Sequence, residues 1–246
     1  MVLYVLVIFA VILGALAQRV AGLGFAMISA PMLVLLLGAF DGVLLVNLCG
    51  AVSALLIITR VWRRIDWRQF GLLLIPALIT IIPGTIVSVR YAGPVLQIVV
   101  GAILVVGLSG SLIVRRAFRR VPATPSALIA GAVSGFTNAT AGIGGPALSV
   151  HAVLTRWDPW VFAATVQPYF VITGSVAFVA KIAGSPGGLP DYQWWLWVMV
   201  LGAILAGLAI GERLSRVVSQ RATAIAVIVL AYSGGIVAIV DGALAL

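Results

Sequence analysis

Apolar stretches of about 20 residues recur along the whole chain, and they constrain its fold more than any other feature. The polar segments between them are too short to form a separate soluble domain. Of the 246 residues, 63% are hydrophobic and 9% are charged, whereas soluble domains are about half apolar and about a quarter charged. The sequence therefore predicts an all-α polytopic membrane protein.

The apolar stretches divide into two sets of five. The linker at residues 115–125 carries four arginines and two prolines, which marks it as the boundary between the sets. We therefore expect a first transmembrane repeat over residues 1–120 and a second over residues 121–246. The predicted apolar segments are 1–17, 24–38, 41–60, 70–90 and 94–114, then 126–141, 144–155, 159–181, 192–212 and 222–243.

The first two segments of each set are shorter than the others. At about 1.5 Å per residue, a helix of such length does not reach across a hydrocarbon core of about 30 Å. We expect each pair to form a broken or re-entrant helical hairpin, although two full but thin crossings are an alternative. Either way the pair returns the chain to its starting side. Three further spans then make the second repeat inverted relative to the first.

The distribution of basic residues agrees with an inverted repeat. The net charge of +9 comes almost wholly from arginine, and the arginines lie in loops between spans. Positive-inside sorting explains them, so a nucleic-acid partner is not expected. The prediction places the arginine-rich loops in the cytoplasm and both termini outside. One side then holds Arg60, Arg63, Arg64, Arg68, Arg115, Arg116, Arg119, Arg120, Arg156, Arg213, Arg216 and Arg221, and the other holds Arg90 and Lys181.

Two glycine-containing stretches, at 21–29 and 141–149, interrupt the apolar segments at matching points. Gly22 and Gly24 recur 120 positions later as Gly142 and Gly144. The helices that follow begin at about Phe25 and Gly145, and their N-termini should point inward from opposite faces. A helix N-terminus offers unpaired N–H groups and a partial positive charge. Broken helices at matching points of two repeats therefore predict an anion site near the midplane.

Polar residues next to both glycine stretches support this site. Gln18 and Asn138 are themselves 120 positions apart, so an amide recurs at equivalent points. The alternative is that glycine and serine merely allow close helix packing. The predicted substrate-binding set is Gln18, Arg19, Gly22, Gly24, Thr137, Asn138, Thr140, Gly142, Gly144 and Gly145.

Two ionisable residues near the glycine stretches have open roles. Arg19 is interpreted as a direct anion ligand or a residue of the pathway, with a gate-facing arginine as the alternative. His151 is a candidate for proton coupling, and a packed, hydrogen-bonded histidine is the alternative. The amides Asn47, Gln97 and Gln167 are interpreted as interhelical hydrogen-bonding residues. For Gln167 the alternative is a second polar patch, because the following Pro168 frees a backbone carbonyl.

The sequence does not predict an enzyme. All six acidic residues fall in predicted loops or at span ends, and there is no pair of a nucleophile with a base and no phosphate-binding loop. No cofactor is expected, and a lone histidine without cysteine or histidine partners does not predict a metal site.

At these glycine motifs the chain resembles the sulfite exporter TauE/SafE family, also called the TSUP transporters. The resemblance rests on Gly22-Leu23-Gly24 with Pro31 downstream, on residues 138–146, and on the two-repeat layout over about 250 residues. It covers the whole chain. It implies a carrier in the bacterial inner membrane for small sulfur-containing or organic anions such as sulfite, sulfonates or sulfoacetate, in either direction.

The leading hypothesis is a secondary carrier of small anions that works by alternating access around the two hairpin tips. An anion channel on the same frame and a non-transporting membrane scaffold are the alternatives. The expected partners are a small anionic substrate and the lipid bilayer, and a homodimer is compatible with the sequence.

Overall fold

The protein is described here by a computed structural model, which covers residues 2–91, 93–117, 121–185, 193–215 and 220–246. This described part is entirely helical, and its ten α-helices correspond to the ten predicted apolar segments. The fold is therefore the predicted all-α one. The helices are α1 (Val2–Ala21), α2 (Phe25–Leu37), α3 (Ala39–Val61), α4 (Trp67–Arg90), α5 (Pro94–Ala117), α6 (Ala123–Ala141), α7 (Gly145–Thr155), α8 (Pro159–Gly184), α9 (Trp194–Leu214) and α10 (Gln220–Leu244), with a short 3-10 turn at Trp62–Arg64.

Six stretches among the described residues are long and apolar enough to cross a membrane, which supports a multi-pass membrane protein. They are Val2–Ala21, Ala39–Arg64, Trp67–Arg90, Pro94–Ile113, Pro159–Gly184 and Trp194–Leu214. The expectation that the first segment of each repeat is short is wrong, because α1 has 20 residues and α6 has 19. The short helices are α2 with 13 residues and α7 with 11 residues.

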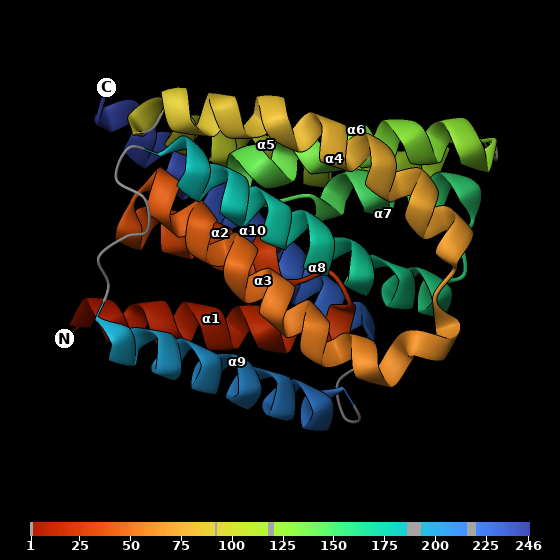
Figure 1. Ribbon diagram of the computed structural model, residues 1–246, viewed down its shortest axis with the longest axis horizontal. Helices are drawn as coiled ribbons and strands as arrows, with labels where there is room; N and C mark the ends of the chain where they lie inside the picture. The colour runs from red at the N-terminus through yellow and green to blue at the C-terminus, as the bar shows by residue number, and fades with distance from the viewer. Residues whose placement is uncertain (1, 92, 118–120, 186–192, 216–219) are drawn as a thin grey trace.

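The helices pack in a pattern that treats the two halves alike. Helix α1 packs against α9, and α6 packs against α4; in the same way α2 packs against α10, and α7 packs against α5. Helices α3 and α8 pack against each other near the middle of the bundle. Figure 1 shows that α1 and α6 run in opposite directions, as do α3 and α8, and α5 and α10.

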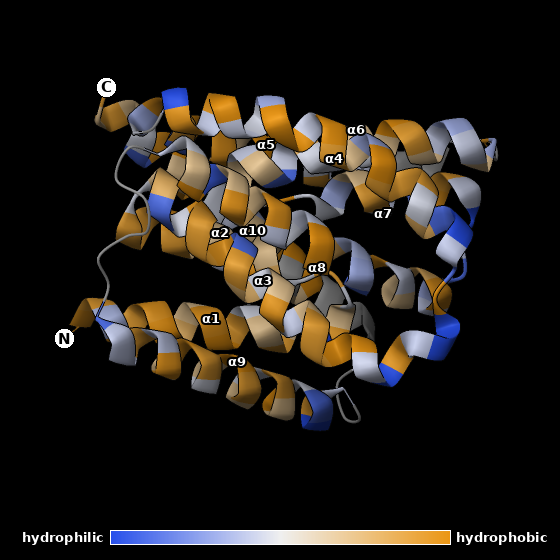
Figure 2. Ribbon diagram, viewed as in Figure 1, coloured by the Kyte–Doolittle hydropathy of each residue, from blue (hydrophilic) through white to orange (hydrophobic). Residues whose placement is uncertain are grey.

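One end of the bundle is rich in arginine, and Figure 2 shows hydrophilic segments there. We call it the arginine end, because the helix ends and turns that gather there in Figure 1 (the ends of α3, α7 and α9 and the start of α4) carry Arg60, Arg63, Arg64, Arg68, Arg156 and Arg213. We call the opposite end the terminal end, because α1 begins there and α10 ends there. Lys181 and Arg90 lie in the last turns of α8 and α4, toward the terminal end.

The starts of α4 and α8, at the arginine end, are capped by side chains. The carboxylate of Asp66 accepts hydrogen bonds from the backbone N–H groups of Arg68 and Gln69 at 3.1 and 3.0 Å. Asp158 caps α8 in the same way, with two bonds of 2.9 Å. Aspartate is well suited to this position because its oxygen satisfies N–H groups that have no partner within the helix. The starts of α2 and α7 inside the bundle have no such cap.

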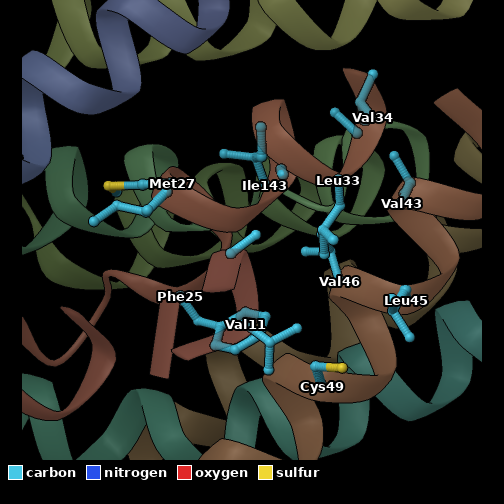
Figure 3. Close-up of a cluster of buried hydrophobic side chains, with 14 of the residues drawn as sticks. Val11, Phe25, Met27, Leu33, Val34, Val43, Leu45, Val46, Cys49 and Ile143 are labelled. Atoms are coloured by element: carbon cyan, nitrogen blue, oxygen red, sulfur yellow. The ribbon is translucent and has the colours of Figure 1, made fainter. Parts of the chain in front are cut away.

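The largest apolar core lies around the α1–α2 hairpin and extends to the second half of the chain. Ile143, from the connection between α6 and α7, is fully buried in it. Figure 3 shows this residue among side chains that come from the first half, including Phe25 and Leu33. The core therefore holds the tip of the second hairpin inside the bundle, close to the first.

Candidate functional site

The two glycine stretches adopt the same backbone conformation. Gly22 has φ +79° and Gly142 has φ +74°, in the left-handed region that favours glycine. The N–H of each glycine donates to a carbonyl four residues earlier, that of Gln18 or of Asn138, at 2.8 Å in both cases. The repeat seen in the sequence is thus also a repeat of local geometry, in which each glycine ends one helix so that the chain can turn.

The helices that follow the two turns begin alike. The residue before α2 is Gly24 with φ −89° and ψ −16°, and the residue before α7 is Gly144 with φ −94° and ψ −16°. Neither start has a side chain that caps it. The first N–H groups of a helix have no partner within that helix, and they carry a partial positive charge. Both starts can therefore donate hydrogen bonds to an anion.

Close packing also explains some of the glycines. A Cβ atom on Gly24 would lie 2.6 Å from the backbone of Ala17, and a Cβ on Gly144 would lie 2.5 Å from the Ser134 hydroxyl. A Cβ on Gly145 would lie 3.0 Å from the Met27 side chain, so the two hairpin tips touch each other. Close packing and ligand binding are therefore compatible roles for these glycines, because close packing brings the two uncapped helix starts to one place.

A small cavity of about 30 Å³ lies between the two tips and the central helices α3 and α8. About 10–15 Å³ of such space holds one water molecule. This cavity has room for roughly two waters, which is less than a sulfonate group needs. Its walls contain three amide side chains, several glycines and apolar residues: Gln18, Leu23, Phe25, Ala26, Met27, Val46, Asn47, Gly50, Ala51, Asn138, Gly142, Gly145, Phe170 and Gly174.

The three amides at the cavity have unused hydrogen-bonding atoms. Gln18, Asn47 and Asn138 are all at least 96% buried. Gln18 Oε1, both polar side-chain atoms of Asn47, and Asn138 Nδ2 have no hydrogen-bond partner among the described residues. A buried polar group without a partner is costly. Several such groups around one cavity are available to a polar ligand, which makes this cavity the candidate site.

A fourth amide, Gln167 of α8, connects to the first tip. Its Nε2 donates to the carbonyls of Gly22 at 3.1 Å and Ala163 at 2.8 Å, and its Oε1 accepts a 3.2 Å bond from Gln18 Nε2. Gln167 lies 120 positions after Asn47, just as Asn138 follows Gln18. The sequence prediction interpreted Asn47 and Gln167 as interhelical hydrogen-bonding residues, with a second polar patch at Gln167 as the alternative, and did not include them in the site. The shared spacing was the signal that could have added them to the site.

The predicted site residues divide into three groups. Gln18, Asn138, Gly142 and Gly145 line the cavity. Gly22, Gly24 and Gly144 shape the backbone of the two tips but do not line the cavity. Thr137, Thr140 and Arg19 are directed elsewhere, as the following contacts show.

The two threonines of α6 face away from the cavity. Thr140 donates from Oγ1 to the Phe136 carbonyl at 2.8 Å and to the Gly84 carbonyl of α4 at 3.3 Å. Thr137 lines an outer apolar groove of about 650 Å³ between α5, α6 and α7.

Arg19 lies near the arginine end, in an ion cluster. Its guanidinium binds Glu212 of α9, with Nε donating at 2.7 Å. Arg60 of α3 donates to the same carboxylate oxygen at 2.8 Å. The Arg19 side chain is absent from the cavity wall, so the cluster connects three helix ends near the cavity and does not form part of it.

His151 lies on the groove side of α7. Its Nδ1 is 2.9 Å from the Ser126 hydroxyl, and its ring meets Trp157 edge to face. The ring is fully buried, and its Nε2 has no partner among the described residues. It lines the outer groove with Thr137 and not the cavity.

The described part of the chain contains no cluster of three or more His, Cys, Asp or Glu residues that could hold a metal ion. The cavity wall itself has neutral amides and uncapped helix starts, with no acid, base or nucleophile. Such an arrangement can bind a ligand through hydrogen bonds.

The helices indicate an integral membrane protein, and its interior holds a small cavity lined in part by buried amides. Comparison with known proteins makes the assignment specific. The family model described as "Sulfite exporter TauE/SafE" matches residues 6–237. The chain belongs to this family, as its glycine motifs predicted.

A curated relative is the "Probable membrane transporter protein y4hK" of Sinorhizobium fredii, which is 33% identical over 165 residues. The alignment covers 61% of this chain and 63% of that relative, so the chain spans less than two thirds of it. No solved structure matches the chain. The printed name of that relative describes a probable membrane transporter, and the family description names a sulfite exporter.

Proposed function

We propose that the protein is a secondary carrier of small anions that binds its substrate in the cavity between the two hairpin tips. One observation carries the proposal: three buried amides with unused polar atoms and two uncapped helix starts face the same small space. Two half-helix N-termini pointed at one site suit an anion, because each supplies N–H donors and a partial positive charge.

The substrate class follows from the donors and from the family. A compact group with several oxygens can accept bonds from Asn47 Nδ2, Asn138 Nδ2 and the two helix starts together. Sulfite and the sulfonate group have this shape, and the family description names sulfite. The proposed substrates are therefore sulfite, sulfonates or sulfoacetate.

Alternating access follows from the pairing of the helices. The matched packing of α1 with α9 and of α6 with α4, and the opposite directions of equivalent helices, support two inverted repeats over residues 1–120 and 121–246. In such transporters one bundle rocks against the other around a central site. The small size of the cavity corresponds to a closed arrangement, which must widen to admit an anion.

The proposed location is the bacterial inner membrane. The arginine end carries most of the basic residues, and basic loops favour the cytoplasmic side. This orientation places both termini outside. It makes the terminal end the outer entrance to the cavity and the arginine end the inner one.

Transport assays on the purified protein in proteoliposomes test the proposal. Radiolabelled sulfite should be taken up with saturation, and unlabelled sulfite inside the vesicles should accelerate uptake by counterflow. Flux that rises linearly with concentration and shows no counterflow would indicate a channel. A protein that neither moves nor binds sulfite, sulfoacetate or small carboxylates would refute transport and favour a scaffold.

A further inference from the structure

A buried lysine lies on the outer side of the proposed site. Lys181 of α8 has no exposed surface, and among the described residues it is the only buried side chain that carries a charge. Its Nζ donates to the Ser88 hydroxyl of α4 and lies 5.1 Å from the centre of the Phe40 ring of α3. Both partners are neutral. The described part of the chain places no carboxylate within 4.0 Å of this ammonium group.

The pairing of α3 with α8 relates this lysine to the cavity. The two helices are antiparallel, and a Cβ on Gly174 of α8 would lie 2.8 Å from the carbonyl of Asn47 on α3. Lys181 comes seven residues after Gly174 on α8, and Phe40 comes seven residues before Asn47 on α3; the two side chains face each other. Seven residues are two helical turns, or roughly 10 Å. Lys181 thus lies about two turns from the cavity wall, toward the terminal end, on the same face of α8 as Gly174.

Apolar residues fill the level between the two sites. By the same pairing, Leu44 of α3 and Ala177 of α8 lie between Asn47 and Lys181, and both are fully buried. The line from the lysine to the cavity is therefore closed in this structure. It follows the interface of α3 and α8, which contributes Asn47 and Gly174 to the cavity wall.

We propose that Lys181 forms an outer binding site for the transported anion, which it passes on to the amide cavity when the α3–α8 interface opens. This inference rests on the proposed function and adds a residue to it. A buried cation that has no carboxylate within 4.0 Å among the described residues is costly until a counter-charge arrives. Its partners Ser88 and Phe40 orient the ammonium group without neutralising it, so an anion entering from the terminal end supplies the missing charge.

Arg90 is the other basic residue near the terminal end, and it provides the matched control. Its side chain is exposed, so solvent and salt screen its charge. Neutralising Arg90 should change anion uptake little. Neutralising Lys181 should have a large effect, because the same charge acts there in a medium of low dielectric constant.

The experiment measures uptake of radiolabelled sulfite as a function of concentration in proteoliposomes of known orientation. For Lys181→Met we expect the KM from the terminal side to rise by at least about tenfold, the loss typical of one hydrogen bond to a charged group. Lys181→Arg should keep a KM near that of the wild type, as should Arg90→Gln. Thermal unfolding in detergent should show that Lys181→Met is as stable as the wild type or more so, since a buried charge has been removed.

A second variant tests the idea without removing the lysine. Ser88→Asp provides an internal counter-charge, so it should stabilise the protein and raise the KM from the terminal side. A wild-type KM in a folded Lys181→Met or Ser88→Asp variant overturns the proposal while leaving the carrier function intact. A wild-type protein that does not take up sulfite contradicts the proposed function itself, and the two failures are thereby distinguished.

Discussion

Replacing Asn138 by leucine should separate substrate affinity from stability. Asn138 lies in the last turn of α6, is 96% buried, and lines the cavity with its side chain. Its Nδ2 has no partner among the described residues, whereas its backbone carbonyl accepts the N–H of Gly142 at 2.8 Å. Asn138→Leu keeps this backbone bond and nearly the same side-chain shape, and it removes only the amide.

The two expected effects have opposite signs. An unsatisfied buried donor costs about 1–3 kcal/mol, so its removal should leave the folded protein equally stable or more stable. A hydrogen bond to a charged ligand contributes about 1.5–3 kcal/mol, so its loss should weaken anion binding by about 10- to 150-fold. The variant should therefore unfold at the same or a higher temperature and bind sulfite much more weakly.

Gln97→Leu is the matched control. Gln97 is also a buried amide, but its Nε2 is paired with Asp241 at 2.6 Å and it lies outside the cavity. Its replacement removes a formed bond and should lower thermal stability, while the KM for sulfite stays at the wild-type value. Thermal unfolding in detergent and concentration-dependent uptake in proteoliposomes measure both quantities for both variants.

The reasoning is wrong if Asn138→Leu unfolds markedly earlier than the wild type, because the amide would then have an undetected structural role. It is also wrong if a folded Asn138→Leu protein keeps the wild-type KM. In that case the unused Nδ2 does not donate to the substrate, and the cavity between the tips loses its main support as the binding site.

Three further variants test other parts of the structure. Gly142→Leu should abolish transport and lower stability, because a Cβ there would lie 2.9 Å from a side-chain carbon of Val46 at a φ that disfavours leucine; Gly110→Leu, which has open space, is its control in uptake and unfolding assays. Glu212→Gln should lower thermal stability modestly without changing the KM, since its cluster lies outside the cavity; a raised KM would instead implicate Arg19 in binding. His151→Gln should leave the KM at a fixed pH unchanged. If His151 couples proton movement to transport, uptake by this variant should also lose its dependence on pH between about 5 and 8. A variant with the pH profile of the wild type excludes that role.

The sequence predicted the helices well because long apolar runs leave little freedom. Where the sequence prediction failed, the cause was a contact between residues that lie far apart in the chain. The first segment was expected to end at residue 17, since Gln18 and Arg19 are polar. In the structure α1 continues to Ala21, because Arg19 binds Glu212, 193 residues away, and Gln18 binds Gln167. The helix then ends at Gly22, where glycine permits the turn.

The site was predicted in part for a similar reason. The glycine repeat located both tips, and the repeated amides Gln18 and Asn138 do line one cavity. Asn47 was missed because an amide within a span most often serves helix packing. Only the fold shows that it faces the tips with its polar atoms unused. Arg19 was placed in the site by its position in the hairpin, and the sequence alone could not show its partner.

Amides recur at equivalent positions of the two repeats, but Lys181 and Ser88 do not. This asymmetry bears on the direction of transport. Gln18 corresponds to Asn138, and Asn47 corresponds to Gln167. In contrast, the position equivalent to Lys181 holds Val61, and the position equivalent to Ser88 holds Leu208. Gln18, Asn47 and Asn138 line the central cavity between the two tips, so their replacement should raise the KM from both sides alike. Replacement of Lys181 should act only from the terminal side. Uptake measured separately in the two orientations tests this distinction, and an equal effect of Lys181→Met from both sides would show that the lysine is not at an outer entrance.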